Sequence, residues 1–547
     1  MQVLGGGIGR AVIYTDEREI TEENIIRVLQ ETFPTHLANA AKIEELLRFE
    51  AGVQPQLRAK VTRTEIDAHC IDNVANEVVE FKTGYDWGNP ITLVQRGEKD
   101  SGKKDENKGI ARLNEAYASE FLSKKQQELA RYVEITGVGY TFVDINRYWR
   151  EGKSYFTYDV LHPGFAYIVK SSTLGHRKLL GVTYSTDKFG NYHFTAFTDT
   201  QRFEIDSLYD ADSDREPTGN KFVDDYAWRE RRFNGQKNPL GINPIVEWER
   251  AADRMGCFER QIPEMLELNQ LESDFSNQVG QVVNAVWWAN NVEFPTETVT
   301  DSDGNEKEVV SHPENGDWIE TNTTRDGKDP RIEPLTIDSD YAGQLENILA
   351  KRALILQKSQ VPQRGDSSNS TGIATSAASG WDAAESSANK KQMFMESAKL
   401  EEVEVVLAAV RASRDIEKDN PMLDLKYMDV QPSIKRQKNY ELVSKANFFA
   451  TMVSHGVHPK PLLKEMNAFA DPEQVYIDSK PYLEMYINAT FKKDENTGNG
   501  NGYNGYGWYQ KGNSNTGDGG SGEAKPNKDR LGQDESDQVK NSPNIKG

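Results

Sequence analysis

The sequence of 547 residues has few cysteines and no long apolar run. Its two cysteines, Cys70 and Cys257, are too few for a disulfide framework or a zinc site of their own, so we expect two buried, reduced thiols in a cytosolic protein. No run of about 18 apolar residues occurs, as a membrane-spanning helix would need. The N-terminus, MQVLGGGIGR, lacks the apolar core of a signal peptide. We therefore expect a soluble chain that is not secreted by that route.

The sequence also lacks the usual patterns of catalysis. The glycines at 5–7 and 9 are not placed between a strand and a helix, as a dinucleotide-binding loop requires. Gly152-Lys153-Ser154 resembles the end of a phosphate-binding loop, but Arg147 occupies the position of its first glycine. The eight histidines are scattered without metal-ligand spacing. We predict no enzyme, and no catalytic, cofactor-binding or metal-binding residues.

The charge is strongly acidic and unevenly distributed. The chain has 86 Asp and Glu against 65 Lys and Arg, a formal net charge of −21. Residues 491–547 contain eight of each sign, so the whole excess lies in residues 1–490. A protein that holds nucleic acid tightly shows a basic footprint. Either this acidity serves solubility alone, or the protein meets nucleic acid without retaining it.

Two amphipathic helices flank a β-type segment between Cys257 and Pro362. Apolar residues recur at three- and four-residue steps in both, which places one apolar stripe on each helix. The first helix, from Pro263 to Ala289, would be roughly 40 Å long at 1.5 Å per residue. Such lengths suit a tall stalk packed beside copies of itself. The stripe residues are Phe258, Ile262, Met265, Leu266, Phe275, Val279, Val282, Val283 and Val286, then Tyr341, Leu345, Leu349, Ala353 and Leu356.

Residues 1–255 indicate a mixed α/β unit. One amphipathic helix is expected to carry Leu113, Tyr117, Phe121, Leu129 and Tyr132, and to stop at Gly137.

Asp338, Ser339 and Asp340 are candidate caps for the second stalk helix. The other expected helices are Glu23–Leu47, Thr64–Asn76, Asp382–Arg414 and much of 433–490. The expected strands are Val78–Lys82, Ile91–Val94, Gly139–Asp144, Phe156–Leu161, Phe165–Val169, Gly181–Thr186, Tyr192–Phe197 and Ile245–Trp248, with further short strands at Trp287–Phe294, Val309, Trp318–Glu320 and Arg331–Ile337.

Four blocks, taken in order, resemble the SPP1-type family of tailed-bacteriophage portal proteins. The first is Asp72–Tyr85 followed by Gly88–Ile91, and the second runs from Glu128 to Tyr140. The third is Asn243–Trp248 with Gly256–Glu259 and Leu268-Asn269, and the fourth is Val361-Pro362 with Ser370–Ala374. Each block alone is a weak signal, but their order and spacing are specific. The resemblance spans roughly residues 40–480.

The resemblance implies an α+β portal fold made of several regions. These are an α/β wing (1–255), a long antiparallel helical stem (256–288 and 339–361), a small β-containing clip (289–338), a return to the wing with a channel loop and a long helix (362–432), and a crown-like helical region (433–490). Residues 491–547 form a Gly/Asn-rich tail that is disordered by composition. The family pattern gives no role for this tail.

The resemblance also implies a function and a set of partners. Portal proteins form a ring, usually a dodecamer, at one capsid vertex of the virion, through which the terminase motor packages viral DNA and from which the DNA is later ejected. The implied partners are other copies of the chain, the terminase large subunit, a head-completion or adaptor protein, and the major capsid and scaffolding proteins. Double-stranded DNA would pass without sequence specificity, and no membrane is involved. Assembly would take place in the host cytoplasm.

Within that scheme we predict two groups of functional residues. Acidic residues of the first stem helix would partly face the channel, with a solvated outer face as the alternative. Cations of the second stem helix would form weak basic rings or, as we favour, pair with carboxylates of a neighbouring subunit. The predicted channel residues are Glu264, Glu267, Glu272, Asp274, Lys351, Arg352, Lys358, Ser376, Ser379 and Trp381. The predicted motor- or adaptor-facing clip residues are Glu293, Asp301, Asp303, Glu306, Asp317 and Trp318.

Two other readings are compatible with part of the sequence. A non-channel structural or scaffold protein of a large viral assembly would share the stalk and the acidity. A carboxylate-dependent, metal-using hydrolase has only the acidic composition in its favour. A ring with a central hole distinguishes the portal from both.

Overall fold

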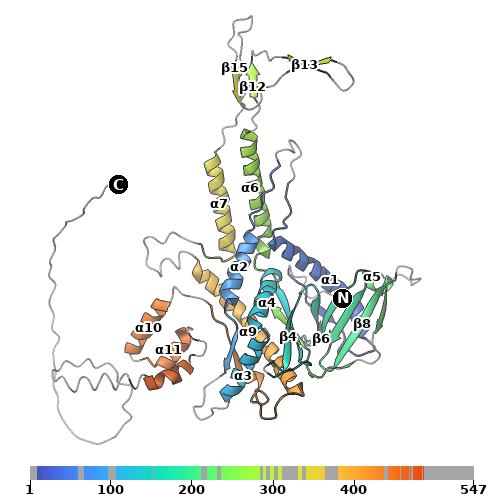
Figure 1. Cartoon of the computed structure of the whole chain (residues 1–547), viewed down its shortest axis with the longest axis vertical. Helices are drawn as coiled ribbons and strands as arrows, with labels where there is room; N and C mark the ends of the chain where they lie inside the picture. Colours follow the sequence, from blue (N-terminus) through green and yellow to red (C-terminus); the bar gives the residue numbers. More distant parts are fainter. Residues whose placement is uncertain are drawn as a thin grey trace, which may run out of the picture.

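The computed structural model has a helical pair standing on a mixed α+β body (Figure 1). It describes residues 9–58, 67–96, 106–151, 153–210, 219–230, 236–283, short strands between 287 and 334, 340–363, 380–436 and most of 442–485. Every structural statement below concerns these residues.

A seven-stranded sheet with one long helix forms the N-terminal part of the body. Helix α1 (Ile25–Glu50) carries Phe33, which is fully buried and meets four aromatic rings edge-on. The sheet order is β1-β5-β6-β7-β8-β10, with β9 also paired to β8, and β1 runs parallel to β5. The strands are β1 (Ile13–Thr15), β5 (Ala166–Ser171), β6 (Lys178–Thr186), β7 (Tyr192–Phe197), β8 (Gln201–Tyr209), β9 (Tyr226–Glu230) and β10 (Gln236–Lys237), with the short helix α5 (Lys221–Asp224) before β9.

A three-stranded sheet and two helices form the centre of the body. The sheet has the order β11-β3-β4, with β3 (Val138–Ile145) between β4 (Phe156–Leu161) and β11 (Ile245–Glu249). Helix α9 (Trp381–Ala412) crosses β3 and β11, and helix α4 (Leu122–Thr136) leads directly into β3. Gly137 ends α4 with a φ of 81°, a backbone conformation that glycine adopts without strain.

Two expectations from the sequence fail at helix α2 (Val74–Trp87): the strand Val78–Lys82 and the start of the helix Thr64–Asn76. The segment Val78–Lys82 was expected to be a strand, but it lies inside α2. Residues 67–73 are not helical, and Asn73 caps α2 by accepting a hydrogen bond from the Asn76 N–H. Val74, Ala75, Val78 and Val79 are all fully buried, and their spacing is that of one helical face. The short run Val78-Val79-Glu80-Phe81 is typical of a strand only in its β-branched and aromatic residue types.

The expected single helix through Leu113 and Tyr132 is also wrong. The structure has two helices, α3 (Glu106–Ser119) and α4, separated at Phe121. Phe121 has a φ of 57°, a left-handed conformation that a helix cannot pass through. Leu113 and Tyr117 of α3 and Leu129 of α4 still reach the same hydrophobic core, which explains why their periodicity resembles that of one helix.

The helical pair consists of helices α6 (Ile262–Val283) and α7 (Tyr341–Lys358), which pack on each other. The 3₁₀ turn η1 (Glu259–Gln261) leads into α6. Helix α6 is shorter than the expected Pro263–Ala289 because it ends at Val283 and Trp287 begins a strand. Asp340 caps α7 as predicted, accepting a hydrogen bond from the Gly343 N–H at 2.9 Å. At the far end of the pair, β12 (Trp287–Asn290) pairs with β15 (Arg331–Pro334), and β13 (Thr296–Thr300) pairs with β14 (Glu306–Val310) (Figure 1).

The C-terminal part begins with a strand that returns to the body. After the 3₁₀ turn η2 (Tyr427–Asp429), β16 (Val430–Ser433) pairs with β2 (Thr92–Gln95). Helices α10 (Leu442–Ser454) and α11 (Pro459–Met466) follow and pack on each other, as the helical pattern after residue 433 predicts. The predicted tail, residues 491–547, lies outside the described residues.

Candidate functional site: the helical pair and its base

The two helices of the pair carry opposite charge. Helix α6 contains Glu264, Glu267, Glu272 and Asp274 and no lysine or arginine. Helix α7 contains Lys351, Arg352 and Lys358 and a single carboxylate, Glu346. The acidic helix therefore has its nearest possible counter-charges on the helix beside it.

Two ion pairs join the helices directly. Lys351 Nζ lies 2.5 Å from Glu267 Oε2, and Lys358 pairs with Glu264. The hydrogen bond from Lys351 and its positive charge lower the pKa of Glu267. Glu267 is exposed and Glu264 is partly exposed, so water screens the attraction and each pair adds little to stability. These carboxylates belong to the same chain as the lysines, and pairing with a neighbouring subunit stays a prediction.

The third cation of α7 ties the pair to the body. Arg352 donates to Asp72 at 2.7 Å and to Glu77 at 2.5 Å, at the start of helix α2. Burial opposes the charged form of Arg352, but these two carboxylates more than offset it and raise its pKa. Arg352 thus has a positioning role that the sequence did not reveal, because Asp72 and Glu77 are far from it in the chain.

The two remaining acids of α6 have no cation within ion-pair distance among the described residues. Asp274 is exposed and accepts a hydrogen bond from Gln270 at 3.0 Å. It lies two turns from Glu267, on the same side of the helix. Glu272 points to another flank, where burial and then the charge of Asp72 raise its pKa. The four acids therefore do not form one continuous stripe.

The apolar contact between the helices is confined to one part of the pair. Met265, Leu268 and Ile355 are fully buried, and Ile348 nearly so, in a core shared with α1 and α2. Of the residues expected on the α7 stripe, Leu356 is buried, but Leu345 and Leu349 are exposed. Because Ile348 and Ile355 face α6, those leucines are turned away from the seam. Leu345, Leu349 and Leu354 on α7 and Val279 on α6 are uncovered in the single chain.

A row of small polar side chains on α6 holds an extended segment of the body. Asn269, Ser273 and Asn277 are buried and accept hydrogen bonds from the backbone N–H groups of Asp72, Cys70 and Ala68. The donor–acceptor distances are 3.0, 3.0 and 2.6 Å. Sequence reasoning missed this row, although polar residues at four-residue steps beside an apolar stripe are a readable signal.

At the base, a buried cluster of charges joins three helices and the strand end before α6. We define the central ion cluster as Asp86, Glu134, Arg250 and Lys391. Lys391 on α9 pairs with Asp86 on α2 and with Glu134 on α4, and Arg250 Nε lies 3.0 Å from Glu134. Burial would raise the pKa of Glu134, but the charges of Lys391 and Arg250 outweigh it and hold that pKa at about 2.

Lys82 connects this cluster to the end of helix α7. Its Nζ donates to the backbone carbonyl of Gln360 at 3.1 Å. Burial lowers the pKa of Lys82 to about 8, and the charge of Lys391 adds to that shift. A second contact across the base is made by Trp381, whose ring packs against Phe81 and Tyr85 of α2, with centroid distances of 6.0 and 5.6 Å. Trp381 is thus part of the packing between α2 and α9.

Several predicted functional residues are not described at the side-chain level. Glu306 begins strand β14, and only its backbone is described. The following predicted residues lie outside the described part of the chain: Ser376, Ser379, Glu293, Asp301, Asp303, Asp317 and Trp318.

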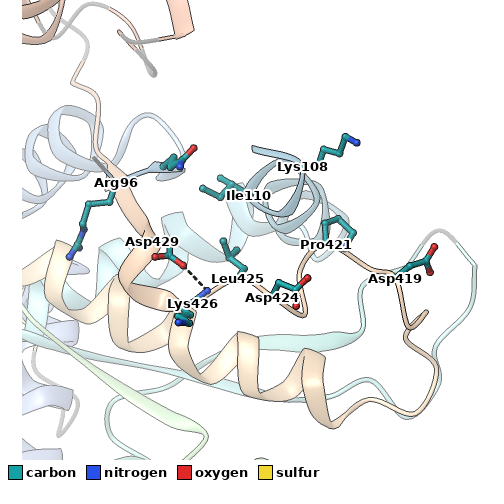
Figure 2. Close-up of a pocket in the computed structure, with 10 residues that line it drawn as sticks. Arg96, Lys108, Ile110, Asp419, Pro421, Asp424, Leu425, Lys426 and Asp429 are labelled. Atoms are coloured by element: carbon teal, nitrogen blue, oxygen red, sulfur yellow. Dashed lines mark hydrogen bonds between the residues drawn. The ribbon is translucent and has the colours of Figure 1, made fainter. Parts of the chain in front are cut away.

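The body also has a cavity of about 750 Å³ between helix α3 and the loop that follows α9. In Figure 2, Ile110 and Leu425 lie at its centre, and Lys108 and Asp419 lie at its outer edge. Its charged lining is balanced, with three cations and three carboxylates, so it favours no ligand charge. The charged lining residues are Arg96, Lys108, Lys426, Asp419, Asp424 and Asp429.

Two further searches of the described residues gave negative results. None of the described helices combines the length and apolar character needed to cross a bilayer. Within the same residues, no group of three or more His, Cys, Asp or Glu side chains could hold a metal ion.

Comparison with known families gives one extensive similarity. A family model described as "Phage portal protein, SPP1 Gp6-like" matches residues 65–477, which is well over half of the chain. The match covers helices α2, α6, α7 and α9, and with them the helical pair and its base. No curated protein matches the sequence.

Proposed function

This chain belongs to the SPP1 Gp6-like family of phage portal proteins, and from that membership we propose that it forms the DNA channel of a capsid. In this proposal, copies of the chain close into a ring, most simply a dodecamer, at one vertex of the virion. Viral DNA enters through the ring when the terminase packages it and leaves by the same route. The role is structural and not enzymatic.

The described elements suggest how the regions divide. The body, with its two larger sheets and α1 to α4, is the wing, and the helical pair is the stem. The strands β12 to β15 at the far end of the pair belong to the clip, where the motor and later a head-completion protein would attach. Helix α9 returns to the wing, and α10 and α11 belong to the crown. The family match across the helical pair is the observation that supports this most strongly.

Electrostatics support a channel that lets DNA slide. Double-stranded DNA carries one negative charge per about 1.7 Å of its axis, and each phosphate bound by a cation adds to the holding energy. On the helical pair, all three cations of α7 are already paired with carboxylates of the same chain. Asp274 remains exposed without an ion pair to a described cation. We propose that the face bearing Glu267 and Asp274 lines the channel.

The partners follow from the same proposal. The terminase large subunit and the adaptor would contact the clip, where Glu293, Asp301, Asp303, Glu306, Asp317 and Trp318 stay predicted contacts. The major capsid and scaffolding proteins would contact the wing.

Electron microscopy of the purified full-length chain tests the ring. We expect annular particles with a central pore in negative stain. Compact particles without a pore, in the presence and absence of scaffolding protein, would exclude the channel and favour a non-channel structural protein of a viral assembly.

A charge reversal tests the channel face. We expect Asp274→Lys to slow DNA translocation several-fold in a packaging assay with the terminase, because a ring of lysines would hold phosphates. The control, Glu417→Lys, makes the same charge change on the exposed loop after α9 and should package like the wild type. Equal packaging by both variants would remove Asp274 from the channel wall.

A further inference from the structure

A small apolar cavity opens on the side of α6 that faces away from α7. Its volume is about 420 Å³, and it lies between the C-terminal end of α1 and the first turns of α6. Val53 at this cavity is 56 % exposed, so apolar surface there is open to solvent. The apolar lining consists of Leu46, Phe49, Val53, Pro55, Ile262 and Leu266, and charged residues beside it are Glu44, Glu45 and Arg48.

The cavity and helix α7 lie on nearly opposite sides of α6. Glu264 turns toward α7, where it pairs with Lys358. Leu266 is two residues further on and lines the cavity. Because a helix has 3.6 residues per turn, side chains two residues apart point to nearly opposite sides.

An exposed leucine of α7 lies at the level of this cavity. Leu354 is 46 % exposed. It lies between Lys351 and Lys358, which reach Glu267 and Glu264 on α6. Leu266 lies between Glu264 and Glu267. Along the axis of the helical pair, Leu354 and Leu266 are therefore at the same level.

We propose that Leu354 of one subunit inserts into the cavity beside Leu266 of the next copy of this chain. The inference depends on the proposed ring, with its axis running roughly along the helical pair. Rotation about such an axis keeps the level of every residue, so an exposed side chain on α7 and a cavity on the far side of α6 can meet head to tail when they share a level. The charges are compatible, since the cavity side carries Glu44, Glu45 and Arg48. The Leu354 side carries Lys351 and Lys358, which keep their pairs with Glu267 and Glu264.

Covalent capture tests this contact in the full-length chain. In a Cys70→Ser background, we expect Val53→Cys combined with Leu354→Cys to give a ladder of disulfide-linked multimers after mild oxidation. Each single variant should give no ladder. The matched control pair is Val279→Cys with Leu354→Cys, because Val279 is 42 % exposed but lies far along α6. A ladder from the control pair alone would overturn the proposed register.

Assembly provides an independent readout. We expect Leu354→Asp to raise the concentration for half-assembly at least about tenfold, since burying an unpaired carboxylate in the apolar cavity costs more than the 1.4 kcal/mol that corresponds to that factor. Leu174→Asp, at a fully exposed leucine between β5 and β6, should assemble normally. Circular dichroism of the dissociated variants checks their folding. Normal ring formation by Leu354→Asp, together with no ladder from the Val53→Cys/Leu354→Cys variant, would refute this contact alone. A wild type without rings would refute the proposed function.

Discussion

The central ion cluster and the ion pairs of the helical pair use the same chemical groups in opposite surroundings. In the cluster, Lys391 and Glu134 are buried, and every charge has a partner from another element. On the helical pair, Glu267 is exposed beside Lys351 and Glu264 is partly exposed beside Lys358. Buried charges fix the elements that hold them, because separating them leaves an unpaired charge without water. The buried cluster therefore fixes the body, whereas the more exposed pairs add little to the contact between α6 and α7. Leu345, Leu349 and Leu354 stay uncovered in the single chain.

The largest expected effect comes from breaking the cluster. Lys391→Met leaves Asp86 and Glu134 buried without their shared cation, and we expect it to reduce the free energy of unfolding by about 3–5 kcal/mol. The first transition in a denaturant titration measures this. If Lys391→Met lowers the free energy of unfolding no more than breaking an exposed pair does, burial does not explain the difference between the two regions.

The pH dependence of stability is a second test of the central ion cluster. Glu134 has a pKa of about 2 in the folded chain and an ordinary value of 4.5. A carboxylate with a lowered folded pKa stabilises above its unfolded pKa, and that stability is lost as the pH falls from about 4.5 towards 2. We expect melting temperatures to drop across this window in the wild type. Glu134→Gln should be less stable at neutral pH and show a flatter profile, and an unchanged profile would contradict the assignment.

The polar row of α6 should show an intermediate effect. Asn277→Leu removes the acceptor for the Ala68 N–H, and we expect a loss of about 1–3 kcal/mol for the unsatisfied donor. Hydrogen exchange of residues 67–73 should speed up, as the segment is released from the helix. Ser276→Ala on the same helix is the control. Equal protection in both variants would show that the row does not hold this segment.

The smallest effect is expected at an exposed pair. Lys358→Met breaks the contact with Glu264, and we expect a change below about 1 kcal/mol, because water screens the pair. The same denaturant titration measures it. A loss as large as that of Lys391→Met would mean that the pair is rigidly fixed within one chain.

The sequence predicted local structure well where one residue sets the backbone. The strand bounds Phe156–Leu161 and Tyr192–Phe197, the helix end at Gly137 and the cap at Asp340 are confirmed. Local periodicity misled where strand and helix patterns coincide, as in Val78–Lys82, and where two helices share one core on either side of Phe121.

The roles of the candidate site residues stay predictions. The chain could be assigned to its family from scattered motifs, and the charged residues of the helical pair could be named. Their partners could not be predicted, because the contact of Arg352 with Asp72 joins residues 280 positions apart. The level of Leu354 relative to Leu266 also depends on how α7 packs against α6, which no local pattern encodes.

In the proposed ring, the helical pair is completed only by neighbouring copies. The native mass of the purified full-length chain, measured over a wide range of concentrations, tests it most directly. We predict a closed assembly whose mass is a fixed multiple of the 61.7 kDa chain. A chain that stays at 61.7 kDa at every concentration, with and without scaffolding protein, would contradict the account.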